Sequence, residues 1–235
     1  MARKRASDQG EKTLASFLEM DPAACTVTVC LASVKDADSE PRFEQLQLSE
    51  ELTEEFRSVV VETLEACRER SKNGDLRVLP YDASSKPETH EVEFLDLSDH
   101  ESVGHQINSL RSLGDVQMFE VDQEFIARLR FYVIVVQCKT GFPLYCFRAY
   151  NHKKEIGRSG KIAAMFAKGT FDQVKDPVFL FDRRVHCMSM GDAMLIFNKD
   201  SFHKIFRFFE ELLKTARKTL AAIKSSVQIE NFDEF

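Results

Sequence analysis

The sequence predicts an α+β protein in which a largely antiparallel β-sheet is covered by two long amphipathic helices, at about 48–72 and 199–224. Two observations predict this class. Apolar residues recur every three to four positions in both helical stretches, and short β-branched or alternating stretches lie between them. Both helices need an apolar surface to cover, and a sheet supplies one. With 235 residues, 43% of them hydrophobic, the chain is long enough to bury a substantial core.

The N-terminal elements follow from local patterns. Residues 1–10 predict a flexible basic tail, and residues 12–19 a short helix. That helix ends before Pro22, because proline disfavours helical backbone in the residue that precedes it. Residues 25–32 alternate through β-branched side chains, which is typical of a strand.

The helix at 48–72 has the strongest local pattern in this half. Ser49 can cap its first turn, and Asn73-Gly74 is a typical stop. Its apolar stripe consists of Leu52, Phe56, Val59, Val60, Leu64 and Cys67. After it, 91–97 alternates charged with apolar residues and predicts a half-buried strand, and 98–113 predicts a short helix.

The second half begins with a central β-hairpin. The β-branched run 131–136 predicts a buried strand, and 144–150 returns beside it after the turn at 140–143. Residues 162–167 predict one or two turns of helix. Three short strands of a meander are then expected at 178–181, 185–190 and 193–197. The closing helix at 199–224 has a predicted buried stripe of Phe202, Ile205, Phe209, Leu212, Ala216, Leu220 and Ile223.

Charge divides the chain although the net charge is only −6. Residues 1–124 carry 13 basic and 27 acidic side chains, a net of −14, and the remaining residues carry 19 and 11, a net of +8. We therefore expect one domain at 11–235, with an acidic subregion at 11–124 and a basic subregion at 125–235. The basic subregion favours a polyanionic partner.

The sequence predicts a cytoplasmic protein. Residues 6–11 are polar where a signal peptide would be apolar, and no apolar run is long enough to cross a membrane. The six cysteines form no CxxC pair and most have apolar neighbours, so we expect small buried side chains. The histidines lack metal-ligand spacing, and we expect neither a metal nor another cofactor.

The clearest functional signal is the basic, glycine-containing stretch at 152–168. Lysine and arginine side chains with free backbone N–H groups suit the phosphate oxygens of DNA. The predicted DNA-binding residues are Lys153, Lys154, Arg158, Lys161, Lys168, Arg183 and Arg184. Each of these residues also fits an ordinary solvated surface. For the basic face of the last helix a solvated surface is the favoured interpretation, and extension of the predicted patch is the alternative.

Two other functions fit parts of the sequence. A metal-dependent nuclease would need Asp122 or Glu124 beside Lys139, which follows the strand at 131–136. A non-catalytic interaction module would use the acidic half to capture a basic protein. The absence of nucleophile and phosphate-loop motifs favours a binding protein over an enzyme.

The basic subregion resembles the KwaB-like family, the B component of the Kiwa anti-phage defence system. The resemblance covers residues 128–215 and depends on the order of its motifs. These motifs are 131–136, 144–150, 161–166, 169–172, 176–182, 195–199 and Phe202. Members of the family usually continue for several tens of residues further, so this chain, which ends at Phe235, is shorter than they are.

The resemblance implies a bacterial defence effector that binds DNA and restrains phage DNA replication or expression. It also implies a membrane-embedded partner, the A component of the system, which would recruit the protein to the inner face of the cell membrane. Family members behave as oligomers, so a homo-oligomer is expected. The resemblance transfers no catalytic residue to this sequence.

Overall fold

The computed structural model describes residues 2–35, 39–111, 123–139, 141–150, 164–167, 170–173, 179–208, 213, 216–217 and 219–220. Its helices and 3-10 turns are α1 (Ala2–Leu18), η1 (Pro22–Ala24), α2 (Glu50–Lys72), η2 (Leu97–Asp99), α3 (Glu101–Arg111), α4 (Gln123–Ala127) and α5 (Lys199–Phe206). Its strands are β1 (Thr26–Ser33), β2 (Arg42–Gln45), β3 (Arg77–Pro80), β4 (Glu91–Asp96), β5 (Leu129–Gln137), β6 (Leu144–Ala149), β7 (Ala164–Ala167), β8 (Thr170–Gln173), β9 (Cys187–Met190) and β10 (Ala193–Ile196).

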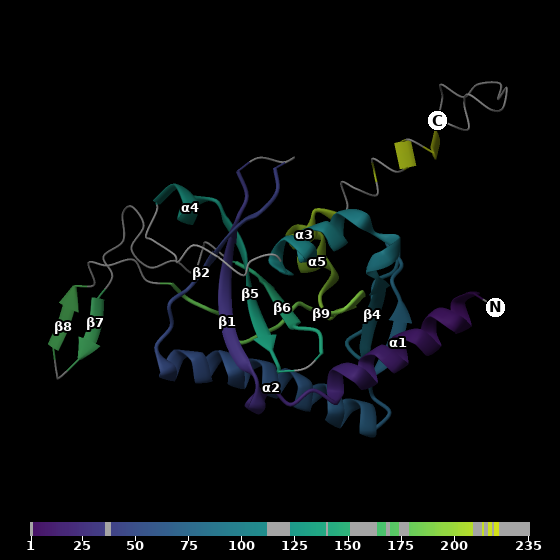
Figure 1. Ribbon diagram of the computed structural model, residues 1–235, viewed down its shortest axis with the longest axis horizontal. Helices are drawn as coiled ribbons and strands as arrows, with labels where there is room; N and C mark the ends of the chain where they lie inside the picture. The colour runs from purple at the N-terminus through teal and green to yellow at the C-terminus, as the bar shows by residue number, and fades with distance from the viewer. Residues whose placement is uncertain are drawn as a thin grey trace.

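Eight strands form one sheet in the order β2-β1-β5-β6-β9-β10-β4-β3, so the predicted α+β class is confirmed. All neighbours are antiparallel except β3 and β4, which run parallel. The four central strands come from the basic half of the sequence, and two strands from the acidic half complete the sheet on each side (Figure 1). The boundary in charge is therefore not a boundary within the sheet.

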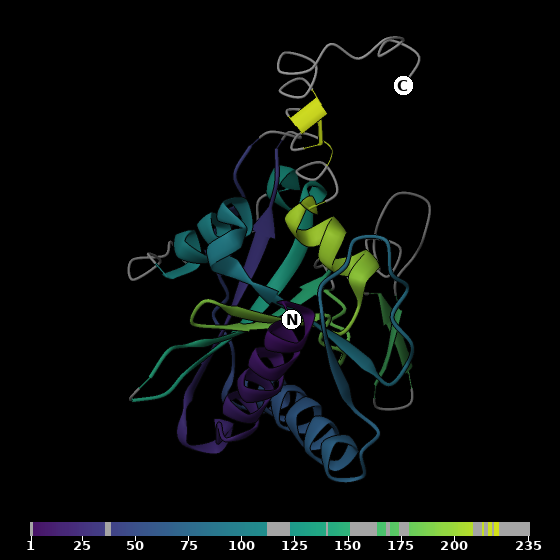
Figure 2. The same cartoon turned by 90° about the vertical axis from the view of Figure 1, so that its right-hand side faces the viewer.

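Helices cover both faces of this sheet. One core lies between the sheet and α1 and α2, where Phe17, Phe56 and Leu64 are buried. The second core lies on the opposite face, under α3 and α5, around Ile107 and Phe202. Figure 2 shows the result, with α1 and α2 below the sheet and α3 and α5 above it.

The first ten residues differ from the predicted flexible tail, because α1 is helical from Ala2. The helix approaches the sheet closely at Gly10. A Cβ atom at this position would lie 2.7 Å from Cγ1 of Val78 and 3.2 Å from Cβ of Phe94. The missing side chain is thus what allows α1 to pack directly on β3 and β4.

Helix α2 is confirmed at Glu50–Lys72, and the side chain of Ser49 caps it by accepting from the backbone N–H of Leu52. The closing helix begins at Lys199 as predicted, and its first segment, α5, ends at Phe206, while the described residues at 208, 213, 216–217 and 219–220 are helical again. At the break, Arg207 adopts a left-handed φ of 54°, and Phe208 turns back into the core beside Tyr81. Beyond this turn, Ala216 and Leu220 are exposed where a buried stripe was predicted.

Two short segments also differ from their predictions. Residues 164–167 form β7, which pairs with β8, where one or two turns of helix were expected. Short apolar runs do not distinguish helix from strand by periodicity, which explains the error. Phe179 and Leu180 lie outside any strand, whereas the predicted β9–β10 hairpin is confirmed.

The cysteines divide into two groups. Cys30, Cys67, Cys146 and Cys187 are buried thiols, as predicted. Cys25 and Cys138 instead form a disulfide between the ends of β1 and β5. These strands pair in a register that puts Thr26 opposite Gln137, so the two cysteines follow as the next neighbouring positions.

Candidate functional site

Most of the predicted DNA-binding residues lie outside the described part of the chain. These are Lys153, Lys154, Arg158, Lys161 and Lys168. Arg183 and Arg184 lie in the described segment between Phe179 and β9, and both are exposed. This segment therefore shows directly what surrounds two of the seven predicted cations.

Arg183 lies against α2. Its Nη1 donates to Oε2 of Glu55 at 2.5 Å, and its Nη2 donates to Oε1 of Glu62 at 2.7 Å. The same Nη2 donates to Oγ of Ser58 at 2.8 Å. One guanidinium thus contacts three oxygen atoms on successive turns of an acidic helix.

The neighbouring residue Asp182 belongs to a second network, on β6. Its Oδ2 accepts a hydrogen bond from Nη2 of Arg148 at 2.6 Å, and its backbone carbonyl accepts from the hydroxyl of Tyr132 at 2.6 Å. Arg148 also contacts Nε2 of His186, whose Nδ1 accepts from the backbone N–H of Ala149 at 3.1 Å. The network holds the segment before β9 against the end of β6.

His186 is a buried titratable group of this network. Burial, together with repulsion from Arg148, lowers its pKa from 6.5 to about 4, and Asp182 offsets this only in part. Lys204 and Arg184 lower this pKa further. Three cations and one anion therefore surround a histidine that is neutral at pH 7.

Arg148, Arg184 and Lys204 lie around His186, near the end of β6 and the first turns of α5. Ser201 of α5 lies 3.4 Å from Nε2 of His186, and Lys204 is exposed one turn further along the helix. Tyr150, one residue after β6, lies two positions before the basic stretch at 152–168 in the sequence. The exposed members Arg184 and Lys204, with the half-buried Arg148, are called the basic cluster below.

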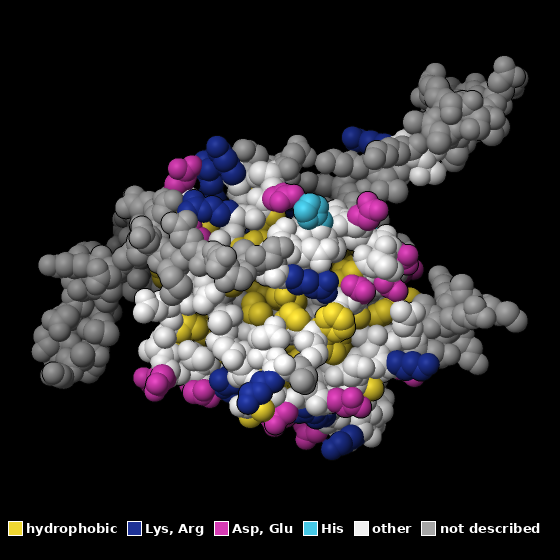
Figure 3. All heavy atoms as spheres, in the orientation of Figure 1, with side chains coloured by type: hydrophobic (Ala, Val, Ile, Leu, Met, Phe, Trp, Pro, Cys, Tyr) yellow, Lys and Arg dark blue, Asp and Glu magenta, His cyan; other side chains and the backbone are white. Residues whose placement is uncertain are grey.

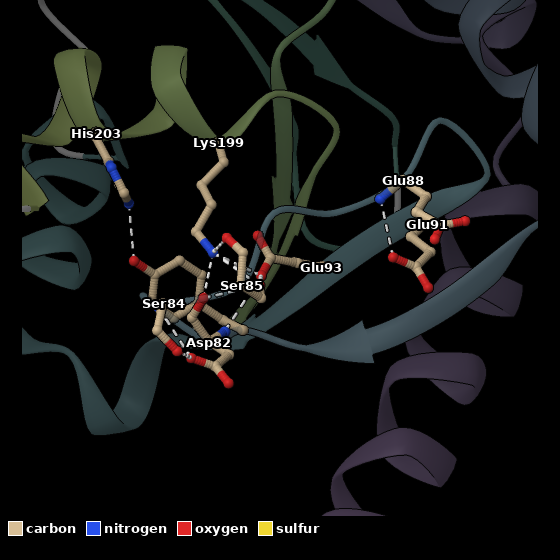
Figure 4. A network of polar contacts seen from close by, with 9 residues as sticks. Asp82, Ser84, Ser85, Glu88, Glu91, Glu93, Lys199 and His203 are labelled. Atoms are coloured by element: carbon tan, nitrogen blue, oxygen red, sulfur yellow. Dashed lines mark hydrogen bonds and ion pairs between the residues drawn. The ribbon is translucent and has the colours of Figure 1, made fainter.

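A third network is buried on the other side of α5 (Figure 4). Nζ of Lys199 lies 3.0 Å from Oε1 of Glu93, and the exposed fractions of the two side chains are 9% and 1%. Lys199 also donates to the carbonyl oxygens of Asp82 and Ser85. The pair therefore joins β4, the 81–85 loop and the first turn of α5.

The contacts of this third network fit a structural function. Ser85 lies 3.0 Å from Lys199, but its hydroxyl donates to Glu93 at 2.8 Å. A lysine that activates a serine must be neutral, whereas Lys199 is held by a buried carboxylate. The network thus lacks the uncharged base that nucleophilic chemistry would require.

Tyr81 and His203 extend the same network. The Tyr81 hydroxyl lies 2.8 Å from Nε2 of His203, and its ring lies 5.0 Å from Nζ of Lys199. Burial and the nearby Glu93 raise the pKa of Tyr81, while burial and Lys199 lower the pKa of His203. The tyrosine is therefore a hydrogen-bond donor to a neutral histidine and not an available nucleophile at pH 7.

The geometry does not support the nuclease hypothesis through Glu124. Glu124 lies on α4 before β5 and pairs with Arg128 at 2.7 Å, while Lys139 follows the far end of β5. The nine residues of β5, at about 3.3 Å per residue, separate the two ends by roughly 30 Å. Asp122 lies outside the described residues. Within the described ranges, no group of three His, Cys, Asp or Glu side chains is placed to hold a metal ion.

Sequence reasoning identified Arg183, Arg184 and the basic character of Lys204, but it missed Arg148, His186 and the Lys199–Glu93 pair. One signal was available for Lys199. A positive charge in the first turn of a helix is unfavourable because that end of the helix dipole is positive. A lysine at this position therefore indicates a buried or nearby anion.

The comparisons with known proteins bear on the second half of the chain. Residues 127–235 match the family described as Kiwa protein KwaB-like. The match begins at the predicted central hairpin and contains the basic cluster as well as the buried Lys199. No curated protein and no solved structure matches the chain.

Proposed function

We propose that this chain, a KwaB-like component of Kiwa anti-phage defence, binds DNA non-specifically through a basic surface and so restrains phage DNA replication or expression. The observation that carries the proposal is the basic cluster. Among the described residues, Arg148, Arg184 and Lys204 lower the pKa of His186, and Asp182 is the carboxylate that raises it. This leaves a local excess of positive charge near the end of β6, after which the sequence continues into the basic stretch at 152–168.

The chemistry of the cluster suits phosphate oxygens more than bases. Arg184 and Lys204 are exposed to solvent, and an ion pair with Asp182 holds the guanidinium of Arg148 in place. Contacts of this type give affinity and orientation but carry little sequence information. They displace counterions, so the affinity for DNA falls steeply as salt increases.

The partners in this proposal follow from the family. The chain acts in the cytoplasm as a homo-oligomer, beside a membrane-embedded A component that recruits it to the inner face of the membrane. Within the described residues, no helix combines the length and the apolar character needed to cross a bilayer. The proposal contains no catalytic step and no cofactor.

The first test is a DNA titration at two salt concentrations, with and without Mg²⁺, in which both retardation and DNA integrity are measured. We expect binding that weakens with salt and leaves the DNA intact. Arg184→Ala combined with Lys204→Ala is expected to weaken binding and to reduce the salt slope by about 2, one unit for each lost phosphate contact. Lys153→Ala combined with Lys154→Ala tests the predicted basic stretch in the same way.

Lys12→Ala combined with Lys86→Ala is a matched control, because both lysines are exposed and lie outside the proposed surface. It removes the same total charge, so it measures the effect of net charge alone. An equal loss of affinity in this control and in the basic-cluster variant would contradict the assignment of the site. DNA loss only with Mg²⁺ would favour a nuclease, and no binding at either salt would favour the protein-interaction module.

A further inference from the structure

Arg183 is bound to an acidic helix and does not lie free on the surface. This residue is a predicted phosphate contact, yet its guanidinium contacts Glu55, Ser58 and Glu62 of α2. Arg184 instead lies close enough to His186 to lower the pKa of that histidine. Two adjacent arginines thus have different environments, one within a cation cluster and one against an acidic helix.

The segment that carries Arg183 is held by its neighbours and not by Arg183 itself. The ring of Phe181 lies 5.1 Å from the rings of Phe56 and Tyr132, and Asp182 is bound to Arg148. These contacts hold the backbone at Phe181 and Asp182 against the central strands β5 and β6. The guanidinium of Arg183 can therefore leave α2 by side-chain rotation alone, while the backbone stays in place.

The acceptors on α2 resemble a phosphate group in their chemistry. Two carboxylates and a hydroxyl present oxygen atoms to one guanidinium, much as the oxygen atoms of a phosphate do. Side-chain exposures of 51% for Arg183, 60% for Glu55 and 58% for Glu62 put the contact in water. Exposed ion pairs contribute little because water and salt screen them, so another anion can replace these carboxylates.

Further carboxylates on the surface of α2 lie near this contact and repel an approaching phosphate. Glu51, Glu54, Glu65 and Glu69 are further exposed carboxylates on α2. Figure 3 shows acidic side chains mixed with basic ones along the lower rim of the molecule, where Figure 1 places α2. A DNA strand that approaches Arg183 therefore also meets these exposed carboxylates of α2.

We propose that α2 is an internal competitor for DNA, in which Glu55, Ser58 and Glu62 occupy Arg183 and are displaced by a phosphate of the DNA backbone. This proposal rests on the proposed function, since it requires that the chain bind DNA. It assigns to the acidic half a regulatory contact that lowers the affinity of the basic half. Any partner that binds the acidic face of α2 would release Arg183 and raise the affinity for DNA.

The test compares double variants in DNA titrations at low salt. Glu55→Gln combined with Glu62→Gln is expected to tighten DNA binding about two- to tenfold, the range that one or two exposed ion pairs allow. Glu65→Gln combined with Glu69→Gln is the matched control, since the described residues show no ion pair between these two glutamates and Arg183. The control is expected to tighten binding less, because it changes only the net charge.

A third pair of measurements isolates Arg183. In an Arg183→Ala background, Glu55→Gln with Glu62→Gln is expected to have no larger effect than the control pair. Equal tightening by both glutamine pairs, or full tightening without Arg183, would overturn the internal competitor. If the unmodified chain and every variant fail to bind DNA, the proposed function itself fails. The two failures are therefore distinguishable.

Discussion

Lys199 and Arg183 are both cations paired with glutamates, but they differ in what surrounds them. Lys199 and Glu93 are buried between β4 and α5, and the ammonium group also donates to two backbone carbonyls and to the hydroxyl of Ser85. Arg183 contacts Glu55 and Glu62 on the outside of α2. A buried charge that loses its partner has no water to replace it, whereas an exposed charge does. The first pair therefore holds the fold, and the second is exchangeable.

The largest expected effect comes from breaking the buried pair. Glu93→Leu leaves the ammonium group of Lys199 buried without its carboxylate, and we expect a loss of about 3–5 kcal/mol in the free energy of unfolding. Adding Lys199→Met should restore part of that loss, because no unpaired charge then remains. Denaturant unfolding of the two variants checks this. A single variant as stable as the unmodified chain would show that the pair is not buried.

The Arg148–Asp182 pair is intermediate in exposure between the other two ion pairs. Its effect can be measured through the pH dependence of stability, because both residues shift the pKa of His186. The pKa of His186 is about 4 in the folded protein against 6.5 as the ordinary value, because burial and Arg148 disfavour the charged ring. Between these pH values the unfolded chain binds a proton that the folded chain does not. The free energy of unfolding should therefore fall as the pH decreases from 6.5 to 4.

His186→Asn is expected to flatten this dependence, measured as the thermal unfolding midpoint against pH. His203→Asn is a useful comparison, because burial and Lys199 also lower the pKa of His203. If His186→Asn left the slope unchanged, His186 would not be neutral in the folded protein. The unmodified chain and both variants can be compared in the same buffers.

The smallest expected effect is that of Arg183→Ala on stability. Since the guanidinium is solvated, we expect no measurable change in the unfolding midpoint at physiological salt. DNA binding should nevertheless weaken, because a phosphate contact is lost. A large loss of stability would mean that Arg183 holds the fold, and the comparison with Lys199 would then be wrong.

Sequence patterns predicted the elements whose periodicity is local. Helix α2 and the strands β5 and β6 were expected within a few residues of their observed bounds. The strand at 91–97 was also expected, but its alternation suggested that Glu93 faces water. Glu93 is buried because β4 lies between β3 and β10, with Lys199 above it, 106 residues later in the chain. No local pattern contains that contact.

In the candidate site, too, local sequence patterns identified the residue types but not their long-range contacts. Arg183 and Arg184 were recognised as cations from composition, but their division between α2 and His186 depends on how the segment packs. The break in the closing helix after α5 was missed for a related reason. The apolar stripe continues in the sequence, yet Arg207 takes a left-handed conformation and Phe208 fills the core beside Phe202. Tertiary packing therefore interrupts the predicted helix at Arg207, although described residues further along the chain are helical again.

The strand order also bears on how the chain folds during synthesis. β1 emerges about one hundred residues before its neighbour β5, and β4 emerges a similar distance before β10. Until the central strands appear, both flanking pairs present unpaired edges, and closure of such long loops slows folding. The central strands, which belong to the KwaB-like part of the chain, would therefore pair first. The flanking strands of the N-terminal half would join the sheet only afterwards. Slow or interrupted synthesis near the middle of the chain should therefore favour aggregation of the N-terminal half over its release as a folded unit.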